Sequence, residues 1–505
     1  MKNEKRTNKI KDASFIKNIG KKELFLYNSI QFDKSDESQC YTILVLGQTG
    51  SGKTTLINSF LNYLLNIKIN DKERYIIINE DIFNDKSISY TLDVNIYYIK
   101  SHNNHPPIKI IDTPGFGENR KTEDDKSIIQ KIGKLFLNKI SKINAICLVV
   151  QSFNIKLTLN QKYIFQSVIN LFGKNVIKNF VIMLTFSDGG KNQIIDSLLN
   201  DASFSIIKKY LQKPWYFNFN NSAIFTDKND QLTDMYFQMA MESFEKFLIK
   251  IKSLPLQSVN ISKDVLIIRE RLNIIIEYLI RQIYNQIKII NCYRNLTNKL
   301  DKINYYNYYS NYKLEIELLE TNYNNCESSM INCRECKTSC QKVFKNIKLN
   351  ESSLFAKGNC IYCILCKCDI RKHIIEEQEI VYRLKSIIVN LNNPNEINQI
   401  KEKNNDYFNS IKKNFFDFFI KFREINQLNE QLQNNALLSG EGNYEDYIDM
   451  MIIDIGKNKN VGFGEGIYIL KQIKKTLNSI FMKKNNRDFE NAVKSELDNF
   501  IKTII

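Results

Sequence analysis

The sequence predicts an α/β domain with a mostly parallel sheet flanked by helices, followed by a long all-α region with a cysteine-rich turn. First, a β-branched run, "YTILVLG", leads through a glycine loop into "TTLINSFLNYLL", whose apolar residues have helical spacing. Second, further apolar strands follow, each ending in polar residues. Third, apolar residues recur at helical spacing beyond residue 255, and eight of the 11 cysteines fall between Cys326 and Cys368.

The glycine loop matches the phosphate-loop template G-x-x-x-x-G-K-[ST] in full, from Gly47 to Thr54. Its glycines let the backbone curl until the N–H groups point inward, and the following helix adds its positive end. Lys53 would add a charge for the terminal phosphates, and the Thr54 hydroxyl would bind Mg²⁺. The loop therefore predicts a nucleoside triphosphate; the alternative is a chance glycine turn.

The segment "PIKIIDTPGFGENR" reads as a strand over 108–111 that ends in the tetrapeptide D-T-P-G. Asp112, at the end of a buried strand, is well placed to hold Mg²⁺ through water. Gly115 would offer its backbone N–H to a terminal phosphate, and loss of that phosphate would release the segment. The alternative reading of Asp112 is a turn residue at a strand end.

A strand predicted over 94–99 follows a polar loop that contains Thr91. A second Mg²⁺-binding hydroxyl belongs in such a loop, and Ser87 and Ser89 compete with Thr91 for the role. A loop threonine with β propensity is an equally good reading.

Two later strands end where a base would bind. The strand over 180–184 runs into T-F-S-D, which places Asp188 at the carboxyl end, where open α/β sheets bind ligands. Its carboxylate could accept two N–H bonds from guanine, a pair that adenine lacks, each worth about 1.5–3 kcal/mol. Asn221 and Ser222 follow the strand over 215–219, where a backbone N–H could meet the guanine oxygen.

In this order, "GQTGSGKTTLINSF", "SYTLDVNIYYI", "IIDTPGFGENR", "FGKNVIKNFVIMLTFSDG" and "FNNSAIF" resemble a small GTPase domain. More narrowly, residues 38–255 resemble the immunity-associated, avirulence-induced (AIG/IMAP-type) G domain, a septin-related branch of the P-loop GTPases. The T-F-S-D segment, in place of the usual N-K-x-D, is the most telling. The resemblance implies nucleotide contacts at Gly47, Gln48, Thr49, Gly50, Ser51, Gly52, Lys53, Thr54, Thr55, Gly115, Thr185, Asp188, Asn221 and Ser222, and Mg²⁺ at Thr54 and Asp112 with Thr91 nearby.

Two departures from the usual GTPase pattern bear on activity. Thr185 stands where the pattern has Asn, so one contact to the ring edge is missing, and Phe186 is a candidate to stack on the base. Phe116 stands where small GTPases often place a water-orienting Gln. Hydrolysis by the candidate catalytic residues Lys53 and Thr91 should therefore be slow without a partner. The family's nucleotide-dependent self-association through the G domain would fit.

The length predicts two or three domains. Motifs and apolar patterns divide the chain into a basic N-terminal extension (1–37), the G domain (38–255), a helical hairpin (256–392) and a C-terminal helical region (393–505). The net charge is +16, but Lys, Asn, Ile and Tyr are abundant throughout, which indicates a solvated surface and makes nucleic acid an unfavoured partner. No apolar run approaches the ~18 residues of a transmembrane segment, and the start lacks a secretory apolar region. A cytoplasmic protein with reduced thiols is expected, with peripheral membrane contact left open.

The cysteine-rich stretch has the spacing of zinc ligands in two C-x₂-C knuckles. The candidate ligands are Cys333, Cys336, Cys340, Cys360, Cys363, Cys366, Cys368 and His373. They suffice for one or two ions. Disulfides and buried apolar cysteines are the alternatives; reduced thiols argue against the first and polar surroundings such as "RECKTSC" against the second.

The flanking sequence predicts a long helix from Ile261 to Tyr323, with Ser262 as a candidate N-cap, and a second helix from Lys372. The cysteines would then lie at the turn of a helical, coiled-coil hairpin, with zinc clamping the tip. Two more helical stretches are expected near 395–434 and 466–505, with "GEGNYEDY" and "VGFGEGIY" as glycine loops.

The favoured function is a GTP-binding switch, or self-assembling GTPase, whose helical arm binds a protein partner, a membrane surface or a second copy. An ATP-using motor or kinase shares the same loop, but D-T-P-G and T-F-S-D favour guanine. The third hypothesis is a zinc-organised helical scaffold whose nucleotide site is only structural.

Overall fold

The computed structural model consists of two compact units, each of which is described by itself. The first comprises Met1–Leu266 with Asn435–Ser439, and the second comprises Ile267–Asn434 with Gly440–Ile505. The structure describes residues 10, 13–29, 40–79, 94–101, 105–116, 122–154, 166, 169–190, 193–200, 208, 215–226, 230–306, 313–343, 354–356, 361–437, 444–458, 462–483 and 489–505. Thr91, Ser87, Ser89 and Cys360 lie outside these residues.

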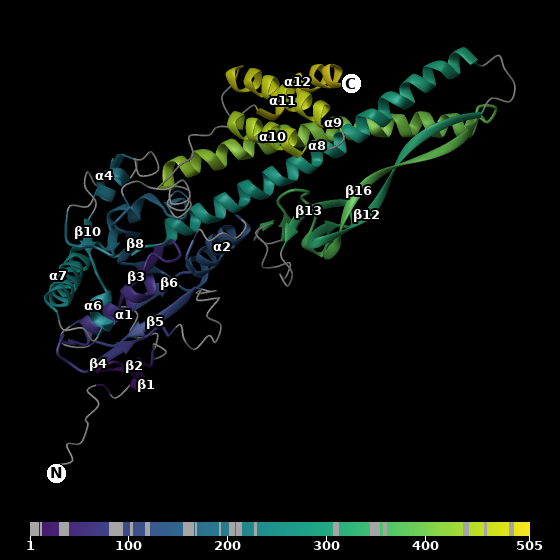
Figure 1. The fold of residues 1–505 in the computed structure, drawn as a ribbon. Helices are drawn as coiled ribbons and strands as arrows, with labels where there is room; N and C mark the ends of the chain where they lie inside the picture. Colours follow the sequence, from purple (N-terminus) through teal and green to yellow (C-terminus); the bar gives the residue numbers. More distant parts are fainter. Residues whose placement is uncertain are drawn as a thin grey trace, which may run out of the picture. The chain divides into compact units, whose positions relative to one another are not determined.

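A six-stranded sheet forms the first unit, in the order β10-β9-β8-β3-β6-β5 (Figure 1). Its strands are β3 (Tyr41–Gly47), β5 (Asn95–Ile99), β6 (Ile108–Asp112), β8 (Ala145–Gln151), β9 (Phe180–Thr185) and β10 (Trp215–Asn218). Only β5 pairs antiparallel with its neighbour among these strands. The carboxyl ends of the other five therefore meet at one edge, the edge at which open α/β sheets bind ligands.

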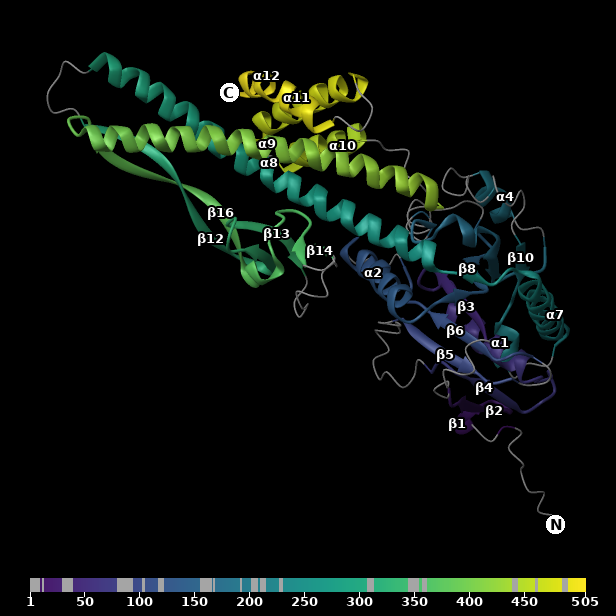
Figure 2. The same ribbon diagram turned by 180° about the vertical axis from the view of Figure 1, so that it is seen from behind.

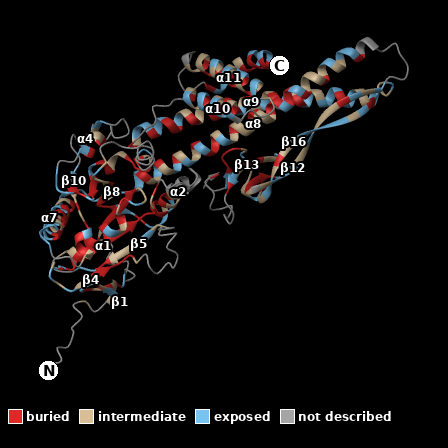
Figure 3. Ribbon diagram, in the orientation of Figure 1, coloured by how far each residue is buried: buried red, intermediate tan, exposed pale blue. Residues whose placement is uncertain are grey.

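Helices cover both faces of this sheet, which explains why its central strands are continuous apolar runs. They are α1 (Lys53–Leu64), α2 (Thr122–Asn138), α4 (Gln193–Asn200) and α7 (Gln231–Ser253). Ile43 and Val45 belong to one core with α1 and α7, whereas Leu44 and Leu46 belong to the other with α2 and α4. Figure 3 shows the buried residues concentrated in this sheet. The predicted α/β fold is confirmed.

The N-terminal segment is part of the first unit. Strands β1 (Ala13–Ile19) and β2 (Lys22–Tyr27) form a hairpin, and β2 pairs in parallel with β4 (Glu73–Ile76). Phe25 stacks on Tyr75 with ring centroids 5.5 Å apart. The domain boundary predicted at residue 38 is therefore too late, because basic side chains flank a short apolar strand, "LFLY".

Shorter elements complete the first unit. They are β7 (Lys142–Ile143), which pairs with β11 (Gln257–Ser258), the 3₁₀ helix η3 (Lys174–Asn179) and α6 (Ser222–Phe225). Ala436 bridges Gly173, and the Leu437 N–H donates to the Phe172 carbonyl at 2.9 Å.

Two long helices and a β-ribbon dominate the second unit. The two long helices are α8 (Asn260–Tyr306), which begins in the first unit, and α9 (Pro394–Asn435). Three shorter helices follow: α10 (Tyr444–Asn458), α11 (Phe463–Lys483) and α12 (Phe489–Ile504). The strands are β12 (Lys313–Cys333), β13 (Thr338–Val343), β14 (Phe355–Ala356), β15 (Tyr362–Cys363) and β16 (His373–Asn390), with the 3₁₀ helix η6 (Ile370–Lys372). Within this unit α8 and α9 lie side by side in both views (Figures 1 and 2), with Tyr293 and Phe408 in ring contact at 5.6 Å.

The predicted helical hairpin over 256–392 is only half right. Its first helix ends at Tyr306 rather than Tyr323, and the helix predicted from Lys372 is a strand. Strands β12 and β16 pair antiparallel from Lys313↔Asn390 to Cys333↔His373. "KLEIELLE" alternates apolar and polar residues with period two, and "HIIEEQEIVYRLKSIIVN" is rich in β-branched residues, so both fit a strand. The cysteine cluster lies at one end of a β-ribbon.

Three further predictions need correction. Ser262 is not an N-cap, because α8 begins at Asn260 and the buried Ser262 hydroxyl accepts the Gly173 N–H at 3.0 Å. The "VGFGEGIY" segment is not wholly a loop, because α11 begins at Phe463 and a Cβ at Gly466 would make ordinary contact with Ile283 at 3.4 Å. Likewise, α10 begins inside "GEGNYEDY". The helical stretch predicted over 466–505 is confirmed and contains parts of α11 and α12.

Among the described residues, none of the helices is both long enough and apolar enough to span a membrane.

Candidate functional site

The phosphate loop links the carboxyl end of β3 to the first turn of α1. Gly52 has φ +86°, a left-handed conformation that favours glycine over residues with a side chain. Lys53 donates from Nζ to the carbonyls of Gly47 (3.1 Å) and Gln48 (3.0 Å), so its charge lies inside the loop. The buried Ser51 hydroxyl has no hydrogen-bond partner among the described residues. Such an atom is typical of a site that a ligand completes.

The D-T-P-G segment lies directly against this loop. The Thr49 N–H donates to the Phe116 carbonyl at 3.0 Å, and the Phe116 N–H donates to the Gly47 carbonyl at 3.3 Å. A Cβ added to Gly115 would lie 2.6 Å from the Thr49 Cα, so only glycine permits this approach. The backbone of Gly115 is therefore held beside the loop that would carry the phosphates.

Asp112 ends β6 at the same edge of the sheet. It is 1% exposed and pairs with Val45 of β3, and the neighbouring Thr113 hydroxyl donates to the Val45 carbonyl at 2.9 Å. Burial, reinforced by the Asp112 carboxylate, raises the pKa of Tyr97 to about 12. Thr54 is half-buried in the first turn of α1 and Thr55 is exposed, so a hydroxyl and a carboxylate flank the loop as an Mg²⁺ site requires.

A single hydroxyl joins the base side of the site to the phosphate side. Thr185, the last residue of β9, donates from Oγ1 to the Ser51 carbonyl at 2.7 Å. A Cβ at Gly52 would lie 3.4 Å from the Thr185 methyl and 3.5 Å from the Phe186 ring. The T-F-S-D segment therefore starts at the phosphate loop, and Asp188 follows three residues later.

The segment containing Asp188 also meets the Asn221–Ser222 turn. The Ser187 N–H donates to the Phe219 carbonyl at 3.0 Å, which brings the two loops together. Asp188 is exposed, and its Oδ1 accepts the Gly190 N–H at 2.8 Å within its own loop. The Ser222 hydroxyl donates to Asn220 Oδ1 at 2.7 Å, at the start of α6.

Sequence reasoning missed three residues at the end of β8. Gln151 Nε2 donates to the Gly50 carbonyl at 3.0 Å, and the Ser152 hydroxyl donates to the Phe186 carbonyl at 2.9 Å. Phe153 is 63% exposed, and its ring lies 6.0 Å from that of Phe186, which is 51% exposed. Phe186 has φ +55°, a strained conformation for a non-glycine residue. Their position at the carboxyl end of a parallel strand is the signal that could have found them.

Together these elements form an anion cradle, a flanking carboxylate and hydroxyl, and an exposed carboxylate two residues after the Phe186 ring. The sequence of this region matches the AIG1 family over residues 41–246.

Residues 41–246 are a G domain of the AIG1 family.

Other comparisons cover the same part of the chain. Septin-8-A of Danio rerio is 28% identical over 141 residues, which span 26% of this chain and 30% of that relative. Solved structures of Toc33 from Arabidopsis thaliana are similar to it. The complex with Mg²⁺ and GMPPNP is 15% identical, covers 44% of this chain and 88% of Toc33, and has a TM-score of 0.31. The complex with GDP and Mg²⁺ is 16% identical, covers 42% and 87%, and has a TM-score of 0.29.

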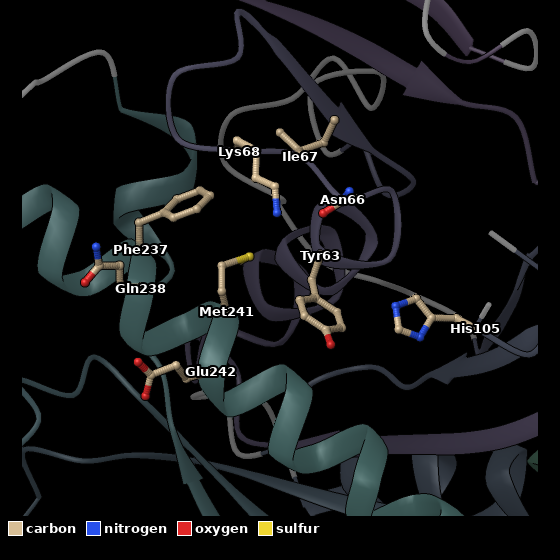
Figure 4. A pocket seen from close by; sticks show the side chains of 9 residues that line it. All are labelled: Tyr63, Asn66, Ile67, Lys68, His105, Phe237, Gln238, Met241 and Glu242. Atoms are coloured by element: carbon tan, nitrogen blue, oxygen red, sulfur yellow. The ribbon is translucent and has the colours of Figure 1, made fainter. Parts of the chain in front are cut away.

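The AIG1 domain also contains a cavity of about 450 Å³ away from the phosphate loop (Figure 4). It is lined by Tyr63, Asn66, Ile67, Lys68, His105, Phe237, Gln238, Met241 and Glu242. Lys53 begins α1, whereas Tyr63 lies at the far end of that helix, so this cavity is separate from the nucleotide site. Burial, with the Lys252 charge as a smaller cause, lowers the pKa of His105.

The second unit gathers most of the predicted zinc ligands. Two groups have ligand atoms within 4.8 Å of one another: Cys333, Cys336, Cys366 and Cys368, and Cys340, Cys363, Cys366 and His373. Cys326 belongs to neither group, and Cys360 lies outside the described residues. No disulfide joins the cysteines that the structure describes. The arrangement provides thiolate and imidazole ligands for a tetrahedral metal site.

Proposed function

We propose that the protein is a GTP-binding switch whose AIG1 domain hydrolyses GTP slowly and whose second unit binds a partner. The choice of guanine rests on the Asp188 carboxylate, and the observation that supports a nucleotide site there is the Thr185–Ser51 hydrogen bond. This bond ties the end of the strand that leads to Asp188 to the phosphate loop, so the segment for base recognition would begin where the phosphates bind. The hypotheses of an ATP-using enzyme and of a zinc-organised scaffold remain as outcomes of the tests.

The residues present fit a magnesium nucleotide. Glycine backbone in a left-handed conformation, the buried Ser51 hydroxyl and the Lys53 ammonium suit phosphate oxygens. Thr54 and Asp112 would hold Mg²⁺, which neutralises charge on the phosphates when bound. The exposed Asp188 carboxylate would accept the two N–H groups of guanine, and Phe186 would cover one face of the base.

Slow hydrolysis is inferred from Phe116. This residue occupies the position of the water-orienting Gln, and its side chain is 0% exposed in the core with α2 and α4. A buried phenyl ring cannot orient water at a phosphate. We infer that a second copy of the AIG1 domain, or another protein, completes the catalytic site. Phe153, which is 63% exposed beside Phe186, offers an aromatic surface to which such a partner could bind.

Replacing Asp188 by asparagine tests the choice of base. The amide would present an N–H group where guanine has its exocyclic amine, and it would match the carbonyl of xanthine instead. We expect GTP affinity to fall by at least about 10-fold, the value of one charge-assisted bond, and XTP affinity to rise. Calorimetric titration with both nucleotides measures the change.

Asp196→Asn is the matched control, because it removes the same charge from an exposed position on α4. Unchanged GTP and XTP affinities in Asp188→Asn would rule out Asp188 as the base-selecting residue. Displacement of bound GDP by ATP as readily as by GTP would favour the ATP-using alternative.

The self-association proposal predicts concentration-dependent turnover. Single-turnover GTP hydrolysis, followed as phosphate release over a wide range of protein concentrations, should accelerate as protein concentration rises. A rate constant that stays nonzero and independent of concentration would contradict catalysis by a second copy. Absence of phosphate release at every concentration would instead support a scaffold with a structural nucleotide site.

We also propose that the cysteine cluster holds structural zinc. The cluster lies at the end of the β12–β16 ribbon, among short strands and turns whose buried apolar side chains include Ile331, Leu354 and Ile364. Thiolate ligation would hold these turns together, since structural zinc contributes about 10–16 kcal/mol to the folding of small metal-binding domains. The ribbon, α8 and α9 would then present a fixed surface to a protein partner or a membrane. A cytoplasmic location remains the expectation.

A further inference from the structure

We propose that the cysteine cluster is a binuclear zinc centre in which the Cys366 thiolate bridges two ions. The inference rests on the proposal that the cluster holds zinc and adds its nuclearity and its bridging ligand. Each of the two ligand groups offers four atoms, the complement of a closed tetrahedral site, and Cys366 is common to both. A thiolate sulfur has enough lone pairs to bind two ions.

The spacing within each group suits tetrahedral coordination. With Zn–S bonds of about 2.3 Å, neighbouring sulfurs on one ion lie roughly 3.8 Å apart. All ligand atoms of each group lie within 4.8 Å of one another, so a small contraction around an ion would bring them to that distance. Seven side chains thus supply the eight coordination positions that two ions need.

Both ions would join the same two parts of the chain. The turn between β12 and β13, together with the adjoining strand ends, supplies Cys333, Cys336 and Cys340. The stretch from β15 to the start of β16 supplies the other ligands. Each group draws ligands from both parts, and backbone pairing of Cys333 with His373 holds the two parts in register.

The orientation of His373 is an independent observation in favour of metal binding. Its Nδ1 lies 2.9 Å from the Asp369 carbonyl oxygen. A carbonyl only accepts, so Nδ1 carries the proton and the lone pair is on Nε2. Nε2 faces the sulfurs of Cys366 at 3.2 Å and Cys340 at 3.8 Å. A metal-binding histidine is commonly held in this way, with its other ring nitrogen donating to a carbonyl.

Cations on α8 and α9, the half-buried Arg281 and the buried Lys421, hold the same turns. Lys421, whose side chain is 5% exposed, donates to the carbonyl of Ile364, inside the Cys363–Cys366 turn. Arg281 donates to the Cys340 carbonyl at 2.8 Å. Six thiolates and two divalent ions leave a net charge of about −2. Lys421 also pairs with Glu424 at 3.1 Å, so Arg281 is the neighbouring cation that would offset part of this charge. One ion would leave excess thiol ligands packed together with no role.

Metal content measured on the reduced, full-length protein tests the proposal. We expect two zinc ions per chain by mass spectrometry. After exchange with ¹¹³Cd²⁺, we expect two NMR resonances split by coupling through a shared sulfur. No bound zinc would overturn the zinc proposal itself. One ion would overturn the binuclear centre, and two ions without coupling would overturn the bridge.

Single substitutions identify the bridging ligand. Cys366→Ser should weaken both ions in chelator competition, by more than the roughly 10–100-fold caused by losing a group that orients a ligand. Cys368→Ser should weaken only one ion, and His373→Ala only the other, because each belongs to one group. Cys326→Ser is the matched control and should weaken neither. Loss of a single ion in Cys366→Ser, or in Cys360→Ser, would indicate two separate sites and overturn the bridge.

Discussion

Replacing Lys53 by alanine is expected to remove most GTP binding. The ammonium lies inside the phosphate loop, bonded to two loop carbonyls, and is the charge that the phosphates would engage. Two charge-assisted bonds of about 1.5–3 kcal/mol each correspond to an affinity loss of about 100-fold or more. Isothermal titration with GTP and Mg²⁺ measures the loss.

Lys246→Ala is the control, because Lys246 lies on α7 with 68% of its side chain exposed. It should bind GTP as the unchanged protein does. Circular dichroism must show that Lys53→Ala remains folded, since Lys53 is buried. A folded Lys53→Ala protein with undiminished GTP affinity would disprove the assignment of this loop.

Removal of zinc is expected to unfold the cysteine-bearing end of the β-ribbon while GDP binding by the AIG1 domain persists. The metal would contribute about 10–16 kcal/mol of local stability, whereas the AIG1 domain has two apolar cores of its own. Hydrogen exchange should show loss of protection in β13 and in the adjoining ends of β12 and β16 after chelation. Calorimetry with GDP should show little change.

Re-addition of zinc is the control for chelator damage and should restore protection. If chelation removes zinc yet leaves hydrogen exchange in β13 unchanged, the metal does not stabilise this region. Loss of GDP binding on chelation would contradict the prediction that the AIG1 domain binds GDP without the metal.

The AIG1 domain could be predicted closely because each of its nucleotide-binding motifs is a local sequence signal. The run from Tyr41 to Lys53 contains a buried strand, a glycine loop and a helix start within a few residues. The contact of Thr185 with Ser51 could not be predicted, since it joins residues 134 positions apart. Phe153 was missed because it belongs to no sequence motif, and only its position after a parallel strand points to the site.

The second unit was harder to predict because its apolar pattern permits two periods. "KLEIELLE" gives neighbours at i and i+4 as well as alternation, and the absence of Pro and Gly favoured one continuous helix. Pairing of β12 with a strand about 60 residues later decides the outcome, and no local propensity reports it. Cysteine spacing predicted zinc ligands, but only the three-dimensional arrangement reveals that Cys366 lies in both groups.

The Thr185 hydroxyl, which joins the end of β9 to the phosphate loop, would make the two halves of a bound nucleotide energetically interdependent. A bound base would contact the segment that Thr185 joins to the main chain around the phosphates. The contributions of the base and of the phosphates to affinity will therefore not simply sum. A guanosine without phosphates would therefore be a poor measure of how strongly this domain holds the base of GTP.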